Sequence, residues 1–299
     1  MADAYTTLTT VTDIVNSEFI DPLLLAYALD KNVAVGLCRM YNLAGRQTKV
    51  ASVAKFVKDS AAAMTEATDV DATALDTSQV AITAAEIGIV RLVTKIAKRT
   101  NILGEEGLMQ FVAREGAELC MEKFETDTLA IYPSASASAG VTQSPMTLGT
   151  FVTGMGKLDT ASARGRKVAV ISDNQATNLR SAAASSQAAV LAADRTDESI
   201  LNARSDAYVG TLFGVPIWLT NLNTTANAAA DDVGMIGIDG NTNPENAPIG
   251  LAQVWGPEVE RSGSATPSAR AEEVAITMMV AAAEVSDFNY VKFVTSATA

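Results

Sequence analysis

The stretch "GTLFGVPIWLTN", residues 210–221, contains a hydrophobic run that stops at Gly-Val-Pro and then resumes as Ile-Trp-Leu. Gly214 tolerates backbone conformations that other residues resist, whereas Pro216 lacks a backbone donor and has a fixed φ. A proline in such a run suits an edge strand or the start of a strand. The stretch therefore predicts one strand that enters a turn and a second strand that leaves it.

The residues on either side of this stretch predict a compact α/β unit at about 146–248, in which apolar runs alternate with helical segments. Thr147 is the expected N-cap of the first helix. In chain order the flanking elements are a helix, a strand, a helix and a strand: "TLGTFVTGMGKLDTA" (147–161), "RKVAVISD" (166–173), "NQATNLRSAAASSQAAV" (174–190) and "DDVGMIGIDG" (231–240).

The longest helix is predicted at 104–125, "GEEGLMQFVAREGAELCMEKFE". Its acidic first turn suits the positive N-terminal end of a helix dipole. At about 100° per residue the side chains divide into two halves, as in a helix that packs one face against a core. The apolar half holds Leu108, Met109, Val112, Ala113, Leu119, Cys120 and Phe124. The polar half holds Gln110, Arg114, Glu118, Glu122 and Glu125.

Two extended segments frame a polar and acidic connection. The first, "TKVASVAKF" (48–56), alternates as an amphipathic strand does, and the second, "SQVAITAAEIGIVRLV" (78–93), is rich in branched residues. The segment between them is too long for a tight hairpin. The pattern predicts a protruding ribbon with an irregular tip. Because such a ribbon cannot bury its own faces, we expect it to meet a partner.

The two ends of the chain differ in character. Residues 1–45 predict an arm, with a helix at 22–30 that begins after Asp21-Pro22. The C-terminal part returns to long strands, "EEVAITMMVAAAEV" (272–285) and "FNYVKFVT" (288–295). In the first of these, alternation places four apolar side chains on one side of the strand: Val274, Ile276, Met278 and Val280.

The composition excludes several classes of function. The sequence of 299 residues contains no histidine, which rules out Ser-His-Asp and Cys-His nucleophiles and the usual zinc-binding sets. The net charge of −12 is opposite to that of a typical nucleic-acid binder. Cys38 and Cys120 lie among apolar neighbours and predict buried thiols. No apolar run is long enough for a membrane helix, and the N-terminus lacks a signal-peptide pattern.

The motif-like segments do not assemble a site. "GTFVTGMGKLD" (149–159) fails as a phosphate loop, because Phe151 occupies the position of the first glycine and Leu158 that of the Ser or Thr. "GIDGNTNPEN" (237–246) lacks the carboxylate spacing of a calcium loop and predicts a surface turn. We expect a solvated loop at Asp69, Asp71 and Asp76, and core positions for Trp218 and Trp255. The sequence thus predicts no catalytic residue, no cofactor and no metal site.

The order of these parts resembles the major capsid proteins of tailed bacteriophages with the HK97 fold. "GTLFGVPIWLTN" is similar to the family's Gly-x-Leu-x-Gly-x-Pro strand and turn, which Gly210, Leu212, Gly214 and Pro216 match. "KVAVISDNQATNLRS" (167–181) resembles the strand and helix found upstream of it. "AEIGIVRLVTKIA" (85–97) looks like the returning strand of the family's extended loop. The resemblance covers nearly the whole chain and rests mainly on the order of its short motifs.

The resemblance implies an α+β fold with named parts. Their expected bounds are an N-terminal arm at 1–45, an extended loop at 46–92, a peripheral domain with a long spine helix at 93–145, an axial domain at 146–248, and return strands of the peripheral domain at 249–299. The Gly-Val-Pro corner would then shape a strand of the axial domain. We expect the subunit interface to involve charged residues in or near the extended loop: Arg46, Lys49, Lys55, Lys58, Glu86 and Arg91.

The implied function is architectural. The chain would assemble with itself into pentamers and hexamers of an icosahedral virion shell that encloses double-stranded DNA, without sequence-specific DNA binding. Partners would be a portal, and a decoration protein in some particles. Because the arm starts at Met1, we expect either a separate scaffolding protein or a mature form of the chain whose numbering was reset after cleavage. Some family members cross-link a loop lysine to a peripheral asparagine. Because no pattern pairs Lys49, Lys55 or Lys58 with Asn289, we expect no cross-link here.

Two alternatives stay open at this point. An encapsulin, the shell of a cellular nanocompartment with the same fold, would enclose a cargo enzyme and would be encoded beside a cargo gene. A small α/β enzyme that uses carboxylates and Mg²⁺ would instead behave as a single stable monomer. The missing histidines and the failed motifs argue against the enzyme.

Overall fold

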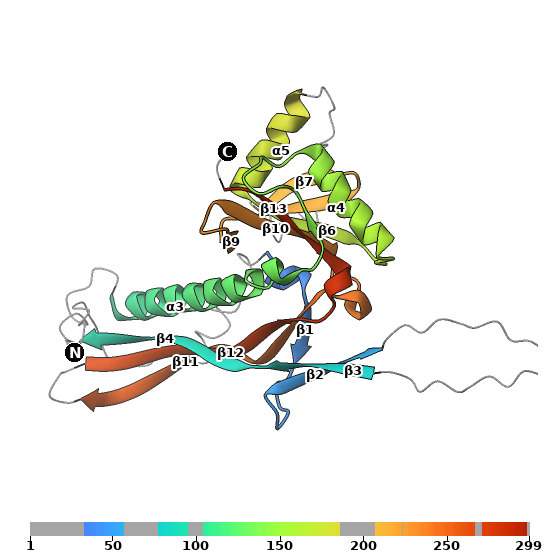
Figure 1. The fold of residues 1–299 in the computed structure, drawn as a ribbon. Helices are drawn as coiled ribbons and strands as arrows, with labels where there is room; N and C mark the ends of the chain where they lie inside the picture. Colours follow the sequence, from blue (N-terminus) through green and yellow to red (C-terminus); the bar gives the residue numbers. More distant parts are fainter. Residues whose placement is uncertain are drawn as a thin grey trace, which may run out of the picture.

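The computed structural model describes residues 33–56, 77–94, 104–185, 207–222, 224–266 and 271–297. These residues form two β-sheets, a two-stranded ribbon and the helices α3, α4 and α5 (Figure 1). The predicted helix at 22–30 and the predicted tip of the ribbon lie outside the described residues. Within the described residues, no helix has the length and apolarity needed to cross a membrane.

The first sheet has four strands and is covered on one face by α3 (Gly104–Leu129). Its order is β1 (Arg39–Asn42), β11 (Ile249–Thr266), β12 (Ala271–Glu284) and β4 (Ala85–Thr94), with β1 parallel to β11 and the other pairs antiparallel. The predicted alternation along β12 is confirmed. The side chains buried toward α3 are those of Val274, Ile276, Met278 and Val280.

Helix α3 is confirmed and runs four residues beyond its predicted end, to Leu129. The helix approaches the sheet closely at Gly116, where an added Cβ would lie 2.7 Å from Ile276 Cδ1. The buried face of α3 is therefore the side of the helix that carries Gly116. Its buried side chains are those of Val112, Ala113, Ala117, Cys120, Met121 and Phe124.

The two halves predicted for α3 need two corrections. Leu119, expected on the buried half, is 38% exposed because it lies to the side of the helix face that packs on the first sheet. Glu125, expected on the polar half, is buried because the segment around Ala34 and Val35 covers that flank of the helix.

The second sheet carries α4 (Leu148–Thr160) and α5 (Asp173–Ser185). Its order is β5 (Ser138–Ala139), β13 (Tyr290–Ser296), β10 (Asp231–Ile238), β6 (Lys167–Ser172), β8 (Val215–Thr220) and β7 (Tyr208–Leu212), and β9 (Thr224–Ala226) also pairs with β10. As predicted, Thr147 caps α4, since its hydroxyl accepts a hydrogen bond from Thr150 N at 3.1 Å. Phe151 of α4 stacks on Phe293 of β13 with ring centroids 5.8 Å apart.

Strand β13 is a correction to the sequence analysis, which grouped residues 288–295 with the return strands. It pairs antiparallel with β10, from Tyr290 opposite Gly237 to Ser296 opposite Asp231. The sequence pattern shows an alternating strand but cannot show its partner. The chain crosses from the first sheet to the second through the 3-10 turn η4 (Asp287–Asn289).

The opening stretch forms the β7–β8 hairpin. Leu212 pairs with Val215, and the two residues between them, Phe213 and Gly214, have φ of 53° and 79°. Two left-handed residues in succession define a type I′ turn, whose twist suits a two-residue hairpin. Gly210, with φ of 145°, lies at an irregularity in the pairing, and Pro216 is the second residue of β8. The predicted strand, turn and strand are therefore confirmed.

The ribbon consists of β2 (Val50–Phe56) and β3 (Thr77–Thr83), paired antiparallel from Val50 opposite Thr83 to Phe56 opposite Thr77. The single long strand predicted at 78–93 is divided at Ala84. There the chain leaves the ribbon and continues as β4 in the first sheet, because β4 finds a partner in β12. The Ala84 amide donates to the Lys49 carbonyl at 2.8 Å, which fixes the base of the ribbon.

Short turns join these elements: η1 (Val35–Leu37), η2 (Tyr132–Ser134) and η3 (Pro244–Asn246). Both cysteines are buried free thiols, as predicted. Trp218 is buried as predicted, whereas Trp255 is half-buried on β11.

Candidate functional site

The described ribbon and the residues that lead into it carry only positive charge. Arg46 and Lys49 are exposed in the approach to β2, and Lys55 is half-buried near the far end of that strand. No Asp or Glu occurs within 43–56 or 77–83. We call strands β2 and β3, with the approach that carries Arg46 and Lys49, the basic ribbon. Its positive charge is opposite to the net charge of the whole chain, which is −12.

The ribbon buries only its base. Ala51 and Ile82, opposite each other in the pairing, are 6% and 1% exposed, and Val53 and Val80 are partly buried above them. The other face presents small and polar side chains, all of them exposed: Ser52, Ala54, Gln79 and Ala81. A two-stranded ribbon with so little burial is marginal alone, so its outer part needs a further surface to pack on.

A second charged surface lies on the first sheet, on the face opposite α3. Four exposed glutamates belong to this acidic sheet face: Glu86, Glu258, Glu260 and Glu273. The pairing brings them together, because Glu258 is opposite Thr277, Glu260 is opposite Ala275, and Glu86 is opposite Met279. Val90, 62% exposed and also opposite Ala275, gives the surface an apolar centre.

The basic ribbon and the part of the acidic sheet face formed by Glu260 and Glu273 lie toward opposite ends of β12, whereas Glu86 of the same face lies beside the base of the ribbon. The ribbon base packs on the β12 segment near Met279, Ala281 and Ala283, and the ribbon runs outward from there. Glu260, opposite Ala275, and Glu273 lie toward the other end of β12, where that strand begins. Complementary patches at opposite ends permit a head-to-tail contact between copies, the kind of contact that closes rings and shells.

The predicted interface residues divide into three groups. Arg46, Lys49 and Lys55 lie together on the ribbon and its approach, and Lys58 is outside the described residues. Glu86 belongs to the acidic sheet face. Arg91 points to the opposite face of the sheet, where its Nη2 lies 2.7 Å from Glu115 Oε1 of α3.

Glu258, Glu260 and Glu273 were not predicted from the sequence. For Glu258 and Glu260 the available signal is the alternation of two acids with an apolar residue, Val259, along β11, and Glu273 precedes the predicted apolar side chain Val274 on β12. Asn289, considered as a cross-link partner, is buried, and its backbone N–H donates to the Ser286 carbonyl at 3.3 Å.

The remaining motif-like segments have structural roles. Asp239 is buried at the end of β10 and accepts hydrogen bonds from the amides of Asn241 and Thr242 and from the Thr242 hydroxyl, which shapes the predicted turn. Within the described part of the chain, no three His, Cys, Asp or Glu side chains are grouped so that they could hold a metal ion.

Comparisons with known proteins give matches at the level of structure. No family model and no curated protein matches the sequence. The capsid of Ralstonia phage GP4 aligns with a TM-score of 0.65 at 9% identity, over 90% of this chain and 92% of that chain. A structure from Mycobacterium phage Che8 aligns with a TM-score of 0.61 at 16% identity, over 98% and 96% of the two chains. The capsid of a native GTA particle aligns with a TM-score of 0.64 at 12% identity, over 99% and 96%.

The alignments with the Che8 structure and the GTA capsid span both sheets, the ribbon and the helices, since they cover 98% and 99% of this chain. At such low identity the likeness is one of backbone architecture. The architecture inferred from the order of short motifs is therefore confirmed: the chain has the α+β fold of HK97-type phage capsid structures.

Proposed function

We propose that this chain is the major capsid protein of a tailed bacteriophage, the structural subunit of an icosahedral shell of pentamers and hexamers around double-stranded DNA. The observation that carries the proposal is the likeness to capsid structures of different phages, and to that of a GTA particle, over nearly the full length of both chains. Its role is structural and involves no catalysis.

The charged surfaces supply a physical basis for self-assembly. In this proposal the basic ribbon of one copy lies on the acidic sheet face of the next, where Arg46, Lys49 and Lys55 approach Glu260 and Glu273. Each exposed ion pair is worth only about 0.2–1 kcal/mol, but the charges also steer the encounter and fix the register. The small side chains of the ribbon and the apolar centre at Val90 would supply the packing.

The proposal gives each predicted part of the chain a role in the shell. Residues 1–45 would lie over neighbouring subunits, the loop at 46–92 would provide the ribbon contact, and the axial domain at 146–248 would gather around the five- and six-fold axes. The second sheet, which also includes β5 and β13, would form the body of that domain. Interface roles for Lys58 and Arg91 remain predictions.

The partners follow from the same proposal. A portal, a separate scaffolding protein and, in some particles, a decoration protein would assemble with the shell in the cytoplasm of the bacterial host, and the product is the virion. The net charge of −12 would limit adhesion of the shell to the packaged DNA.

Electron microscopy of the purified protein, produced alone and together with the candidate scaffolding protein, tests this function. We expect closed shells or capsomer rings in at least one condition. A uniform monomer in every condition would contradict the proposal. Closed shells that contain a cargo enzyme and no DNA, isolated from the native source, would instead identify a nanocompartment.

A further inference from the structure

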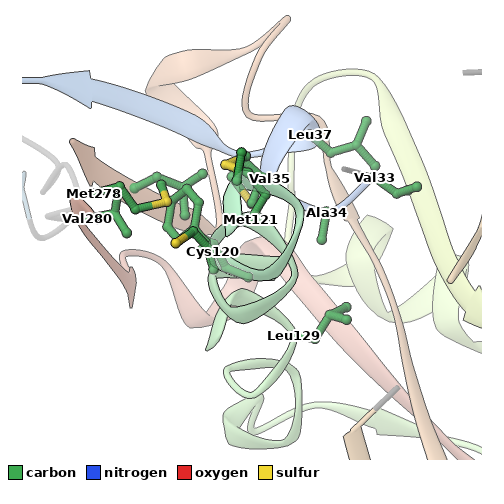
Figure 2. Packing of buried hydrophobic residues seen from close by; sticks show 14 of the residues in the cluster. Val33, Ala34, Val35, Leu37, Cys120, Met121, Leu129, Met278 and Val280 are labelled. Atoms are coloured by element: carbon green, nitrogen blue, oxygen red, sulfur yellow. The ribbon is translucent and has the colours of Figure 1, made fainter. Parts of the chain in front are cut away.

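The N-terminal segment joins the folded body against the C-terminal half of α3. Val33, Ala34, Val35 and Leu37 are all buried there. Figure 2 shows these residues grouped with apolar side chains of α3 and β12, namely Cys120, Met121, Leu129, Met278 and Val280. Apolar packing of this kind holds a segment in place but does not fix its exact position, since it is non-directional.

Glu125 adds a directional contact at this junction. Its side chain is only 2% exposed, and its two carboxylate oxygens accept hydrogen bonds from two consecutive backbone amides. Ala34 N donates to Oε1 at 2.8 Å, and Val35 N donates to Oε2 at 3.1 Å. Hydrogen bonds to an ionised acceptor are stronger than neutral ones, and the two together fix both position and orientation.

Two neighbouring ionisable groups, Cys38 and Tyr132, stay neutral around neutral pH because the pKa of each is raised. Burial, with the negative charges of Glu125 and Asp239, raises the pKa of the Cys38 thiol far above its ordinary value. Burial, with Cys38 and Glu125, raises the pKa of Tyr132 well above the value of an exposed tyrosine. Neither group therefore competes as an anion for the two amides around neutral pH.

We propose that Glu125 is a positioning residue that anchors the N-terminal segment to the spine helix. The carboxylate fixes the position and direction of the chain at Ala34 and Val35 on the surface of α3. Its consequence for assembly rests on the proposed function, because an arm that must reach a neighbouring subunit has to leave in a set direction.

Hydrogen exchange measured by mass spectrometry on the full chain tests the anchor directly. In Glu125→Gln the amide group presents a donor where one backbone N–H needs an acceptor, while size and shape are kept. We expect peptides that contain Ala34 and Val35 to exchange roughly tenfold faster or more. Peptides from β6 and β10 should be unchanged.

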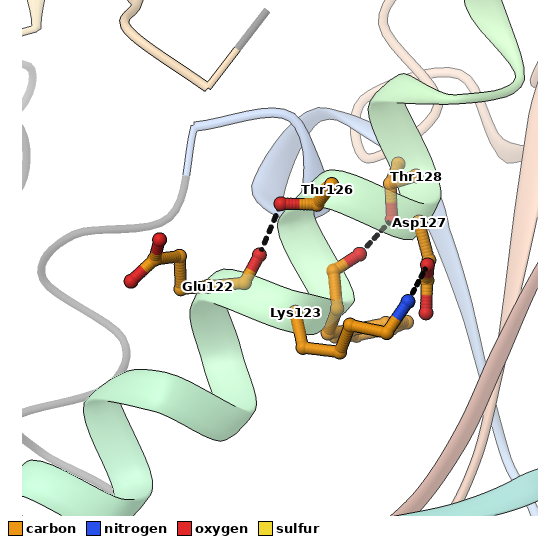
Figure 3. A network of polar contacts seen from close by, with 6 residues as sticks. Glu122, Lys123, Thr126, Asp127 and Thr128 are labelled. Atoms are coloured by element: carbon orange, nitrogen blue, oxygen red, sulfur yellow. Dashed lines mark hydrogen bonds and ion pairs between the residues drawn. The ribbon is translucent and has the colours of Figure 1, made fainter. Parts of the chain in front are cut away.

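Glu122→Gln is the matched control. It makes the same chemical change on the same helix, but Glu122 is exposed, and Figure 3 shows its carboxylate directed away from the helix while its backbone carbonyl accepts the Thr126 hydroxyl at 2.8 Å. This control should exchange like the wild type. Glu125→Asp, which keeps the charge but withdraws it by one methylene, should give an intermediate increase.

Two outcomes would overturn the anchor: unchanged exchange at Ala34 and Val35 in Glu125→Gln, or accelerated exchange throughout both sheets. Assembly is measured separately by electron microscopy. We expect Glu125→Gln to form fewer closed shells than Glu122→Gln, and equal yields would overturn the role in assembly. If the wild type forms no shells, the proposed function fails, while the exchange experiment still decides whether the anchor exists.

Discussion

The second sheet and the β2–β3 ribbon are both built from alternating strands, yet they differ in where their side chains find partners. Every residue of β10 is buried: neighbouring strands flank it, Ile236 packs toward α4 and α5, and Val233 and Met235 pack into the cluster on the other face that contains Tyr132. The ribbon buries Ala51 and Ile82 at its base and leaves most of its outer part exposed. The sheet is thus complete within one chain, whereas the ribbon depends on a surface that another copy can supply.

A buried polar network reinforces this difference. The Gln175 amide at the start of α5 donates to the Asp232 carbonyl at 3.1 Å and to the Thr295 hydroxyl at 2.8 Å. Its oxygen accepts from Ser172 N at 3.2 Å, and the Ser172 hydroxyl donates to the Asp232 carboxylate at 2.6 Å. Buried polar groups that are satisfied in this way specify one packing arrangement of α5, β6, β10 and β13.

The largest effect on stability is expected from Phe293→Ala. Phe293 is fully buried, stacks on Phe151, and closes tightly on Gly154, where an added Cβ would lie 2.7 Å from its Cε1. The cavity left behind should lower the free energy of unfolding by about 3–5 kcal/mol. Val53→Ala on the ribbon should cost below about 1 kcal/mol, because its side chain is only partly buried. Urea denaturation of both variants makes the comparison, and equal losses would contradict it.

A smaller loss is expected from Gln175→Met, which keeps the length of the side chain but removes its hydrogen bonds. Several buried groups then lose their partners, at a cost of about 1–3 kcal/mol in the free energy of unfolding. Gln79→Met on the exposed face of the ribbon serves as the control and should change stability by less than about 0.5 kcal/mol. Thermal denaturation of the two variants measures both values. A neutral Gln175→Met would show that the network adds nothing.

Alkaline pH should lower the free energy of unfolding, because the folded chain buries the thiols of Cys38 and Cys120. Burial raises the pKa of Cys38 and of Cys120, so the folded chain keeps protons that the unfolded chain releases above about pH 8.5. The stability contributed by these protons is complete below that pH. Between about pH 8.5 and 10 it is lost at up to about 1.4 kcal/mol per pH unit per thiol. Urea titrations across this range should show the slope, and replacing both cysteines by alanine should flatten it.

The elements that could be predicted from sequence are those with local causes. Thr147 caps α4 by accepting a hydrogen bond from Thr150 N, three residues along the chain. Gly214 suits the left-handed turn of the β7–β8 hairpin. Helix α3 follows from the helical periodicity of its apolar residues. Phe213 was not singled out, although it takes the other left-handed position of that turn and is 51% exposed.

What could not be predicted depends on distant partners. Strand β13 lies beside β10 and Glu125 is buried only because segments far away in sequence cover them. The candidate site divides in the same way. Arg46, Lys49 and Lys55 cluster along the chain and can be seen in the sequence. The acidic sheet face comes from three strands and exists only once their register is set.

A charge exchange between the two surfaces tests the central claim most directly. Lys49→Glu with Lys55→Glu makes the net charge of the ribbon and its approach negative, and Glu260→Lys with Glu273→Lys reverses the charge of the two glutamates that the ribbon is proposed to meet. Because all four side chains lie at or near the surface, each set should leave the melting temperature within about 2–4 °C of the wild type.

Sedimentation and electron microscopy of the assembled material then give the decisive readout. Each reversed set alone should yield folded, unassembled subunits. The chain that carries all four substitutions should recover assembly, since glutamates at 49 and 55 again meet opposite charges at 260 and 273. Shells formed by both single sets as readily as by the wild type would contradict the ribbon contact on which the account rests.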